Sequence, residues 1–176
     1  MDLLAARSYE RIDKRDLRRL GELAALDREK FFLGRTEYRP RLLCVALCQG
    51  AGKHYVDVKR RAAEPNGVKD FDVWSFLADI PGQRFPANRR NLHADFGPSK
   101  FGREADPPAR WAHFAGRRVD FLMRGLAVPV DADPVVEVQE YLRRAKTKTA
   151  RLLSTKGVVL IEPAALLATI AWPAKK

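Results

Sequence analysis

Cysteine and acidic residues are both scarce in this chain. Of its 176 residues only two are cysteines, Cys44 and Cys48, and 22 Asp and Glu stand against 33 Lys and Arg. Two cysteines without suitably spaced histidines exclude the usual four-ligand zinc site. Both thiols lie in the apolar run Leu42–Cys48, so we expect them to be buried on one side of a strand. No disulfide is expected, which is typical of a reducing compartment such as the cytoplasm.

Long apolar runs are lacking as well. No segment approaches the length of a membrane span, and the charged residues Arg7, Glu10 and Arg11 are untypical of a secretory signal. Internal repeats and low-complexity tracts are also missing. The length predicts one domain over residues 1–176, and we expect no membrane partner.

Positive charge is in excess. The formal net charge is +11, a surplus that favours phosphate-rich partners such as nucleic acid, nucleotides or an anionic membrane surface. The alternative is a basic surface with no partner, which many basic proteins have.

Hydrophobic spacing predicts the helices and strands. Leucines at helical spacing predict a helix over 13–33, capped by Asp13 and ended by Gly34. Alternating or continuous apolar residues predict strands, and Asp133-Pro134 opens an amphipathic helix with a basic face. The expected strands cover 42–47, 70–77, 118–124 and 158–161, the basic helix covers 133–155, and a last helix covers 163–172.

Residues 79–106 are expected to form a long connection without regular structure. Two interpretations of this loop remain open. Either its surface neutralises phosphates and stacks on bases, or its aromatic side chains fix it to the body of the protein while its basic residues are solvated. The residues concerned are Arg84, Arg89, Arg90, Lys100, Arg103, Phe85, Phe96 and Phe101.

Two aspartates stand one residue apart in the segment Asp70-Phe71-Asp72. In a strand both carboxylates project from the same face, while Phe71 and Val73 point into a core. Neighbouring carboxylates repel each other unless a cation or a shared proton lies between them, so the pair suits a metal site. The alternative is ordinary surface charge at an exposed strand start.

A glycine-bearing turn, Gln49-Gly50-Ala51-Gly52, follows the first predicted strand and precedes a short helix from Lys53 to about Lys59. Such a turn can direct backbone N–H groups at a phosphate. Glycine is also common in these turns for steric reasons alone. The segment is not a P-loop, because the Lys-Ser/Thr ending is missing.

The order of these motifs resembles the nucleotidyltransferase-fold superfamily, which includes DNA polymerase beta and the minimal nucleotidyltransferases. Three segments, within residues 40–125, carry the resemblance: Gly50 in its turn, Asp70-Phe71-Asp72-Val73, and Val119-Asp120-Phe121. The family has Ser or Gly where this chain has Ala51. The resemblance implies an α+β fold with a small mixed β-sheet flanked by helices.

The resemblance also implies a metal-dependent reaction. Asp70, Asp72 and Asp120 would be the catalytic residues and would hold Mg²⁺ or Mn²⁺, hard cations that prefer carboxylate oxygens. The cations would bridge the phosphates of an NTP, and a nucleotidyl group would pass to a hydroxyl acceptor, with RNA or DNA as a further partner. The residues expected to bind the nucleotide are Gly50, Ala51, Gly52, Lys53, Arg89 and Arg90.

Two other functions remain open. The first is a catalytically inactive domain of the same fold that binds nucleic acid through its basic loop and its basic helix 133–155. The second is a structural or regulatory partner protein whose aspartates are surface charge. The sequence does not indicate the acceptor, the preferred NTP or the oligomeric state.

Overall fold

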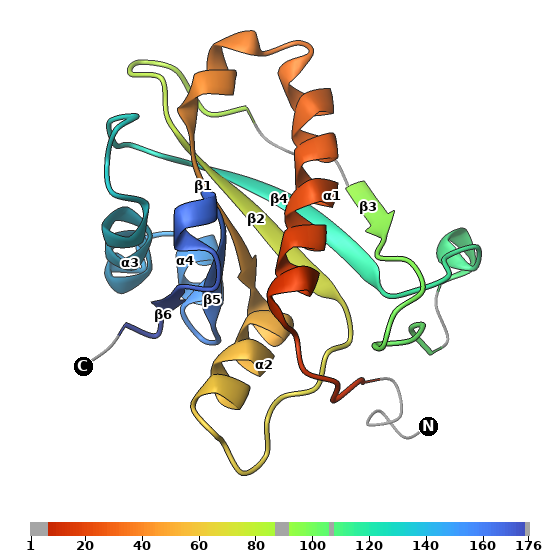
Figure 1. Ribbon diagram of the computed structural model, residues 1–176. Coiled ribbons are helices and arrows are strands. Elements are labelled where there is room, and N and C mark those ends of the chain that lie inside the picture. Colours follow the sequence, from red (N-terminus) through yellow and green to blue (C-terminus); the bar gives the residue numbers. More distant parts are fainter. Residues whose placement is uncertain (1–6, 87–91, 106–107, 175–176) are drawn as a thin grey trace.

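A single mixed sheet of six strands forms the centre of the protein. The computed structural model describes residues 7–86, 92–105 and 108–174 (Figure 1). The strand order is β3-β4-β2-β1-β5-β6; β2 and β4 are parallel, and every other neighbouring pair is antiparallel. The strands are β1 (Leu42–Cys48), β2 (Phe71–Ala78), β3 (Leu92–Asp95), β4 (Arg118–Leu126), β5 (Val158–Glu162) and β6 (Ile170–Trp172).

Helices cover both faces of this sheet, which confirms the expected α+β class. The α-helices are α1 (Lys14–Phe32), α2 (Gln49–Lys59), α3 (Pro134–Arg144) and α4 (Lys148–Leu153), and short 3-10 turns cover Thr36–Arg41, Ala109–Trp111 and Ala164–Leu166. Helices α1 and α2 pack on one face, and α3 and α4 pack on the other. Figure 1 shows α1 running across the sheet in front of β2 and β4.

Strand β2 supplies side chains to both cores. Phe71 and Val73 are buried on the side of α1 and α2, as predicted, while Trp74 and Phe76 are buried on the side of α3 and α4. Because side chains alternate along a strand, Asp72 belongs to the same face as Trp74. The two free cysteines are buried in the core under α3 and α4, as expected.

Helix α1 begins where the sequence predicts. The Asp13 carboxylate accepts hydrogen bonds from the backbone N–H groups of Arg15 and Asp16, and the Asp16 carboxylate accepts one from the N–H of Asp13. This reciprocal capping box satisfies donors that the first turn of a helix leaves free. None of the helices in the described ranges is long and apolar enough to cross a membrane.

The prediction of one continuous basic helix over 133–155 is wrong, because the segment forms two helices, α3 and α4. The chain leaves helical geometry at Ala145, whose φ is 47°, and Thr147 starts α4 by accepting a hydrogen bond from the N–H of Ala150 at 3.0 Å. The Thr147 hydroxyl thus competes with helix continuation. The helix predicted over 163–172 is also wrong, because β6 there pairs with β5.

The prediction that the connection 79–106 lacks regular structure is wrong. It contains β3, which pairs with β4, and two of its aromatic rings are buried against Phe71. Phe96 lies 4.9 Å and Phe101 5.4 Å from the Phe71 ring centroid, and buried Arg117 donates a hydrogen bond to the carbonyl of Phe101. These rings fix the segment to the body of the protein. Arg89 and Arg90 lie outside the described residues.

The predicted glycine turn after β1 is instead the first turn of α2, which starts at Gln49 directly after the strand. Gly52 lies in this turn and faces the backbone of Gly157, just before β5. A Cβ on Gly52 would collide with the carbonyl oxygen of Gly157, and one on Gly157 would lie 2.6 Å from the carbonyl oxygen of Gly52. Steric contact between α2 and β5 therefore accounts for the glycine at position 52.

We predict that Gly52→Ala destabilises the protein by about 2 kcal/mol or more, because the added methyl group overpacks two backbones that cannot separate. Gly34→Ala is the matched control, because a Cβ there has nothing within 4 Å. Its effect should stay within about 0.5 kcal/mol. Urea unfolding of both variants measures the difference. Equal stability would contradict the close approach of α2 and β5.

Candidate functional site

Three predicted aspartates lie together where β2 and β4 begin. The parallel register pairs Asp72 of β2 with Asp120 of β4, so their side chains leave neighbouring strands on the same face. Asp70 precedes β2 and lies two residues before Asp72, which places it on the same side. The face concerned is the one that α3 and α4 cover farther along the strands. Strand pairing thus brings together carboxylates that are far apart in sequence.

Arg118 lies among these carboxylates. Its Nη2 donates a hydrogen bond to Oδ2 of Asp70 at 2.7 Å, and its Nε lies 2.9 Å from Oδ1 of Asp120 in an ion pair without hydrogen-bond alignment. The buried carboxylate of Glu104 is 4.0 Å from Nη1. The guanidinium therefore bridges two of the three aspartates and offsets part of their mutual repulsion.

Two aromatic groups complete the surroundings of Asp120. His93 of β3 stands opposite Asp120 in the antiparallel ladder, and its Nδ1 is in hydrogen-bond contact with Oδ1 of Asp120. The Trp111 ring lies edge-on to His93 at 4.5 Å and also contacts the Arg118 guanidinium, 4.2 Å from the ring centroid. Such a cation–π contact restrains the Arg118 side chain between the two aspartates.

Asp72 differs from the other two aspartates because no hydrogen bond or ion pair joins it to another described residue. The pKa of Asp72 is raised from its ordinary value of 3.8 to about 7, chiefly by burial and also by the nearby charges of Asp70 and Asp120, while Arg118 and Lys156 act in the opposite direction. A buried carboxylate among like charges holds a proton more firmly than one in water. Near neutral pH, Asp72 therefore exchanges readily between its neutral and charged forms.

The N-terminus of α2 adjoins Asp72. Cys48, the last residue of β1, pairs with Asp72 across the sheet, and α2 starts at the next residue. No side chain caps the first turn, and Gln49 there has a left-handed φ of 56°. Such strain in a residue with a Cβ is concentrated at binding sites. The partial positive charge of the helix end thus lies near the start of β2, where Asp72 stands.

Four of the six residues predicted to bind a nucleotide, Gly50 to Lys53, occupy this first turn but differ in availability, while Arg89 and Arg90 lie outside the described residues. Ala51 and Gly52 are buried, and the Gly50 carbonyl accepts a hydrogen bond from Asn66 at 2.9 Å. Lys53 donates a hydrogen bond to Asp57 one turn farther on, at 2.7 Å, so its charge is partly neutralised within the helix.

A pocket of about 480 Å³ lies farther along the same two strands. Trp74 and Leu122 follow Asp72 and Asp120 by two residues and line the pocket, together with the basic residues Arg84 and Arg124. Because residues two apart share a face of the sheet, this pocket continues the surface that carries the aspartates.

Sequence reasoning missed His93, Glu104 and Arg118 as members of the cluster. The pattern Leu92-His93-Ala94-Asp95 alternates apolar and polar residues and could have revealed β3. Arg118 stands two residues before Asp120 on a predicted strand, so alternation alone could have placed both on one face. Glu104 gave no local signal, because its position depends on the folding of the connection around Phe101.

We predict that Asp72→Asn stabilises the protein at alkaline pH. The folded protein retains the Asp72 proton up to about pH 7, whereas the unfolded chain releases it near pH 3.8. Because the folded state binds more protons between these values, the free energy of unfolding of the wild type falls as pH rises from about 4 to about 7. At pH 8 the variant should gain on the order of 2–4 kcal/mol, and near pH 4 it should gain almost nothing. Urea unfolding in EDTA at both pH values measures this.

Asp70→Asn is the matched control for that experiment. It removes the partner of Arg118, so it should destabilise the protein by about 1 kcal/mol rather than stabilise it. If both substitutions had the same sign at pH 8, the described difference between the two carboxylates would be wrong.

Comparison with known proteins identifies no relatives. No protein-family model, curated protein or solved structure matches this chain. The chemistry of the side chains described above is therefore what supports a function.

Proposed function

We propose that this protein is a metal-dependent nucleotidyltransferase that transfers a nucleotidyl group from an NTP to a hydroxyl acceptor. The observation that carries the proposal is the parallel pairing of β2 with β4, which sets Asp120 beside Asp72 and close to Asp70. The N-terminus of α2 lies at the same place. Transfer of a nucleotidyl group needs acidic groups that bind a cation, and a helix N-terminus is well suited to bind the phosphates.

The donor set fits Mg²⁺ or Mn²⁺ by its chemistry, because hard cations prefer carboxylate oxygens and three carboxylates share this face. Among the described residues no group of three acidic, histidine or cysteine side chains is arranged as a ready metal site. Arg118 lies between Asp70 and Asp120, so its guanidinium would have to release one of them. A bound cation would supply positive charge to the phosphates of the nucleotide.

The chain's own groups would orient the nucleotide. The N–H groups at the start of α2, which no side chain caps, would donate hydrogen bonds to phosphate oxygens, a role that the N-terminus of a helix suits. The pocket beyond the aspartates offers Arg84 and Arg124 for charge and Trp74 as part of its lining. Asp120, which contacts His93 and Arg118, would orient an attacking hydroxyl.

A second candidate is a catalytically inactive domain that binds nucleic acid through basic surfaces. The bridge between Asp70, Arg118 and Asp120 favours it, because an internal cation already occupies the space between two of the required carboxylates. Under this alternative the three aspartates have a structural role only.

We predict that Mn²⁺ together with a non-hydrolysable NTP binds the wild-type protein, and that Asp72→Asn weakens binding at least about tenfold, since a neutral amide replaces a carboxylate ligand. Isothermal titration calorimetry measures binding, and release of pyrophosphate measures transfer. Asp72→Asn should fold at least as well as the wild type, so its loss of binding cannot be attributed to unfolding.

Asp131→Asn provides a control at an exposed carboxylate remote in sequence from the cluster. It should bind metal and nucleotide like the wild type. If the wild type binds neither ligand while it still binds RNA or DNA, the enzyme proposal is refuted and the second candidate is supported.

A further inference from the structure

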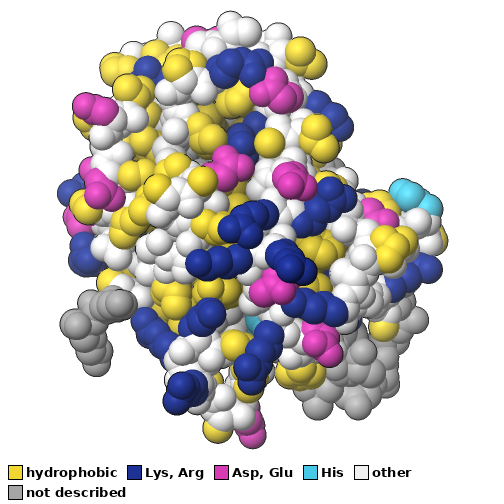
Figure 2. All heavy atoms as spheres, viewed as in Figure 1, with side chains coloured by type: hydrophobic (Ala, Val, Ile, Leu, Met, Phe, Trp, Pro, Cys, Tyr) yellow, Lys and Arg dark blue, Asp and Glu magenta, His cyan; other side chains and the backbone are white. Residues whose placement is uncertain are grey.

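A groove of about 960 Å³ lies between the N-terminal segment and the far end of α2. We name it the basic groove. One wall is the segment that leads into α1, and the other is the end of α2 with the residues after it. Its lining residues are Tyr9, Arg11, Ile12, Asp13, Lys14, Tyr55, Val58, Lys59, Arg61, Ala62 and Pro65. Figure 2 shows Lys and Arg side chains gathered over the lower part of α1 and over α2.

Positive charge in the basic groove is largely uncompensated. Four of its lining residues are basic and exposed, and one, Asp13, is acidic. The Asp13 carboxylate is already engaged with the first turn of α1 and with Lys100 at 3.1 Å. No ion pair joins the four basic residues to acidic groups in the described part of the chain. These residues are Arg11, Lys14, Lys59 and Arg61.

Aromatic surface accompanies this charge. Tyr9 is 51% exposed on one wall, an unusual exposure for a large ring. Tyr55 is buried at the base of the groove, and the Lys59 ammonium lies 5.4 Å from its ring centroid. Proteins hold single-stranded nucleic acid by two features: exposed aromatic rings stack on its bases, and nearby positive charges contact its phosphates.

Arg61 adopts a backbone conformation that suits glycine. It follows the end of α2 with a φ of 56°, in the left-handed region that a residue with a Cβ enters only at a cost. Backbone strain of this kind is concentrated at sites that bind ligands. The Arg61 side chain lines the basic groove.

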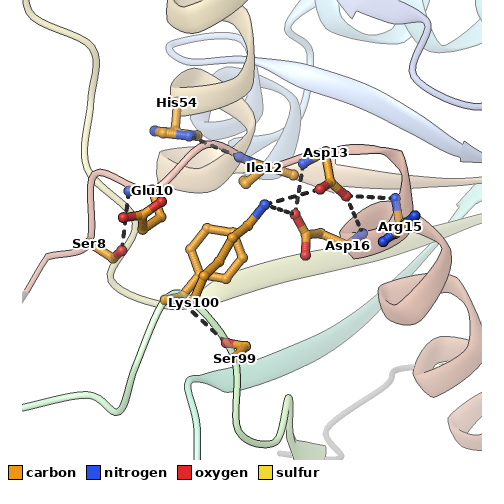
Figure 3. A network of polar contacts seen from close by, with 10 residues as sticks. Ser8, Glu10, Ile12, Asp13, Arg15, Asp16, His54, Ser99 and Lys100 are labelled. Atoms are coloured by element: carbon orange, nitrogen blue, oxygen red, sulfur yellow. Dashed lines mark hydrogen bonds and ion pairs between the residues drawn. The ribbon is translucent and has the colours of Figure 1, made fainter.

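The wall formed by the N-terminal segment is held in place before any ligand binds. Buried His54 contacts the carbonyl of Asn66 through Nδ1, at 2.6 Å, and its Nε2 accepts the N–H of Ile12 at 3.4 Å (Figure 3). Ser8 pairs with Val68 through two backbone hydrogen bonds, and Lys100 joins Asp13 to Asp16. A preformed wall lowers the entropy lost on binding.

We infer that the basic groove binds single-stranded nucleic acid, with Lys14, Lys59 and Arg61 contacting phosphates and Tyr9 stacking on a base. A duplex would be held less well, because its bases are already stacked on each other and cannot reach Tyr9. This surface lies on the side of α1 and α2, whereas the aspartates face the side of α3 and α4. The inference therefore does not depend on the nucleotidyltransferase proposal.

Fluorescence anisotropy with a labelled oligouridine of about 12 nucleotides tests the inference in the full-length protein. Replacing Lys14 and Lys59 with Gln and Arg61 with Gly should weaken binding at least about tenfold and reduce the slope of log K against log salt by about 2, since about 0.7 is lost per phosphate contact. Arg61→Gly also relieves the backbone strain, so it should not impair folding. Tyr9→Ala should weaken binding about tenfold and leave the salt slope unchanged.

Lys30→Gln is the matched control, since it removes one exposed positive charge from the last turn of α1, at the opposite end of this helix from the groove. It should bind oligouridine like the wild type. The inference is overturned if the wild type does not bind, if Lys30→Gln weakens binding as much as Lys59→Gln alone, or if a duplex binds as tightly as the single strand. Tighter binding of polyglutamate or phosphatidylserine vesicles would overturn it too and assign the groove to an acidic protein or a membrane surface.

Discussion

The parallel pairing of β2 with β4 is the constraint on which the rest of the structure depends. Parallel neighbours cannot be joined by a tight hairpin, so the chain needs a long connection between them. That connection supplies β3, the rings that pack on Phe71, and Glu104 beside Arg118. The same pairing fixes Asp120 next to Asp72. One choice of strand direction thus determines both a packed edge of the sheet and its acidic cluster.

A basic side chain of the same protein, Arg118, reduces the repulsion among the carboxylates. Arg118 bridges Asp70 and Asp120, and Trp111 and Glu104 restrict where its guanidinium can lie. Asp72 receives little of this compensation, so its burial and its like-charged neighbours raise its pKa. The site therefore divides into a bridged pair and one less compensated carboxylate. Such an imbalance costs stability, and sites that bind or react commonly retain such costs.

Local patterns in the sequence predicted much of the fold. The spacing of leucines with Asp13 as cap gave α1, and alternation gave β2 and β4 with the correct buried faces. The failures have long-range causes. Thr147 caps a new helix where amphipathic spacing continued, and the segment near Ile170 became a strand because β5 offered an edge. The convergence of the aspartates followed from a resemblance. Alternation along β4 could have placed Arg118 on their face, whereas the position of His93 opposite Asp120 depends on a strand register that no local pattern specifies.

Helix α2 extends from one candidate site to the other. Its first turn adjoins Asp72, and its last turn, with Lys59, lines the basic groove. Its 11 residues span about 16 Å, and Gly52 in its first turn packs directly on the backbone of Gly157 just before β5. The basic groove and the carboxylates lie on opposite faces of the sheet. A polymer anchored in the groove would therefore have to pass along α2 and around the end of the sheet, so only the part of its chain at least about one helix length from the anchor could reach the carboxylates.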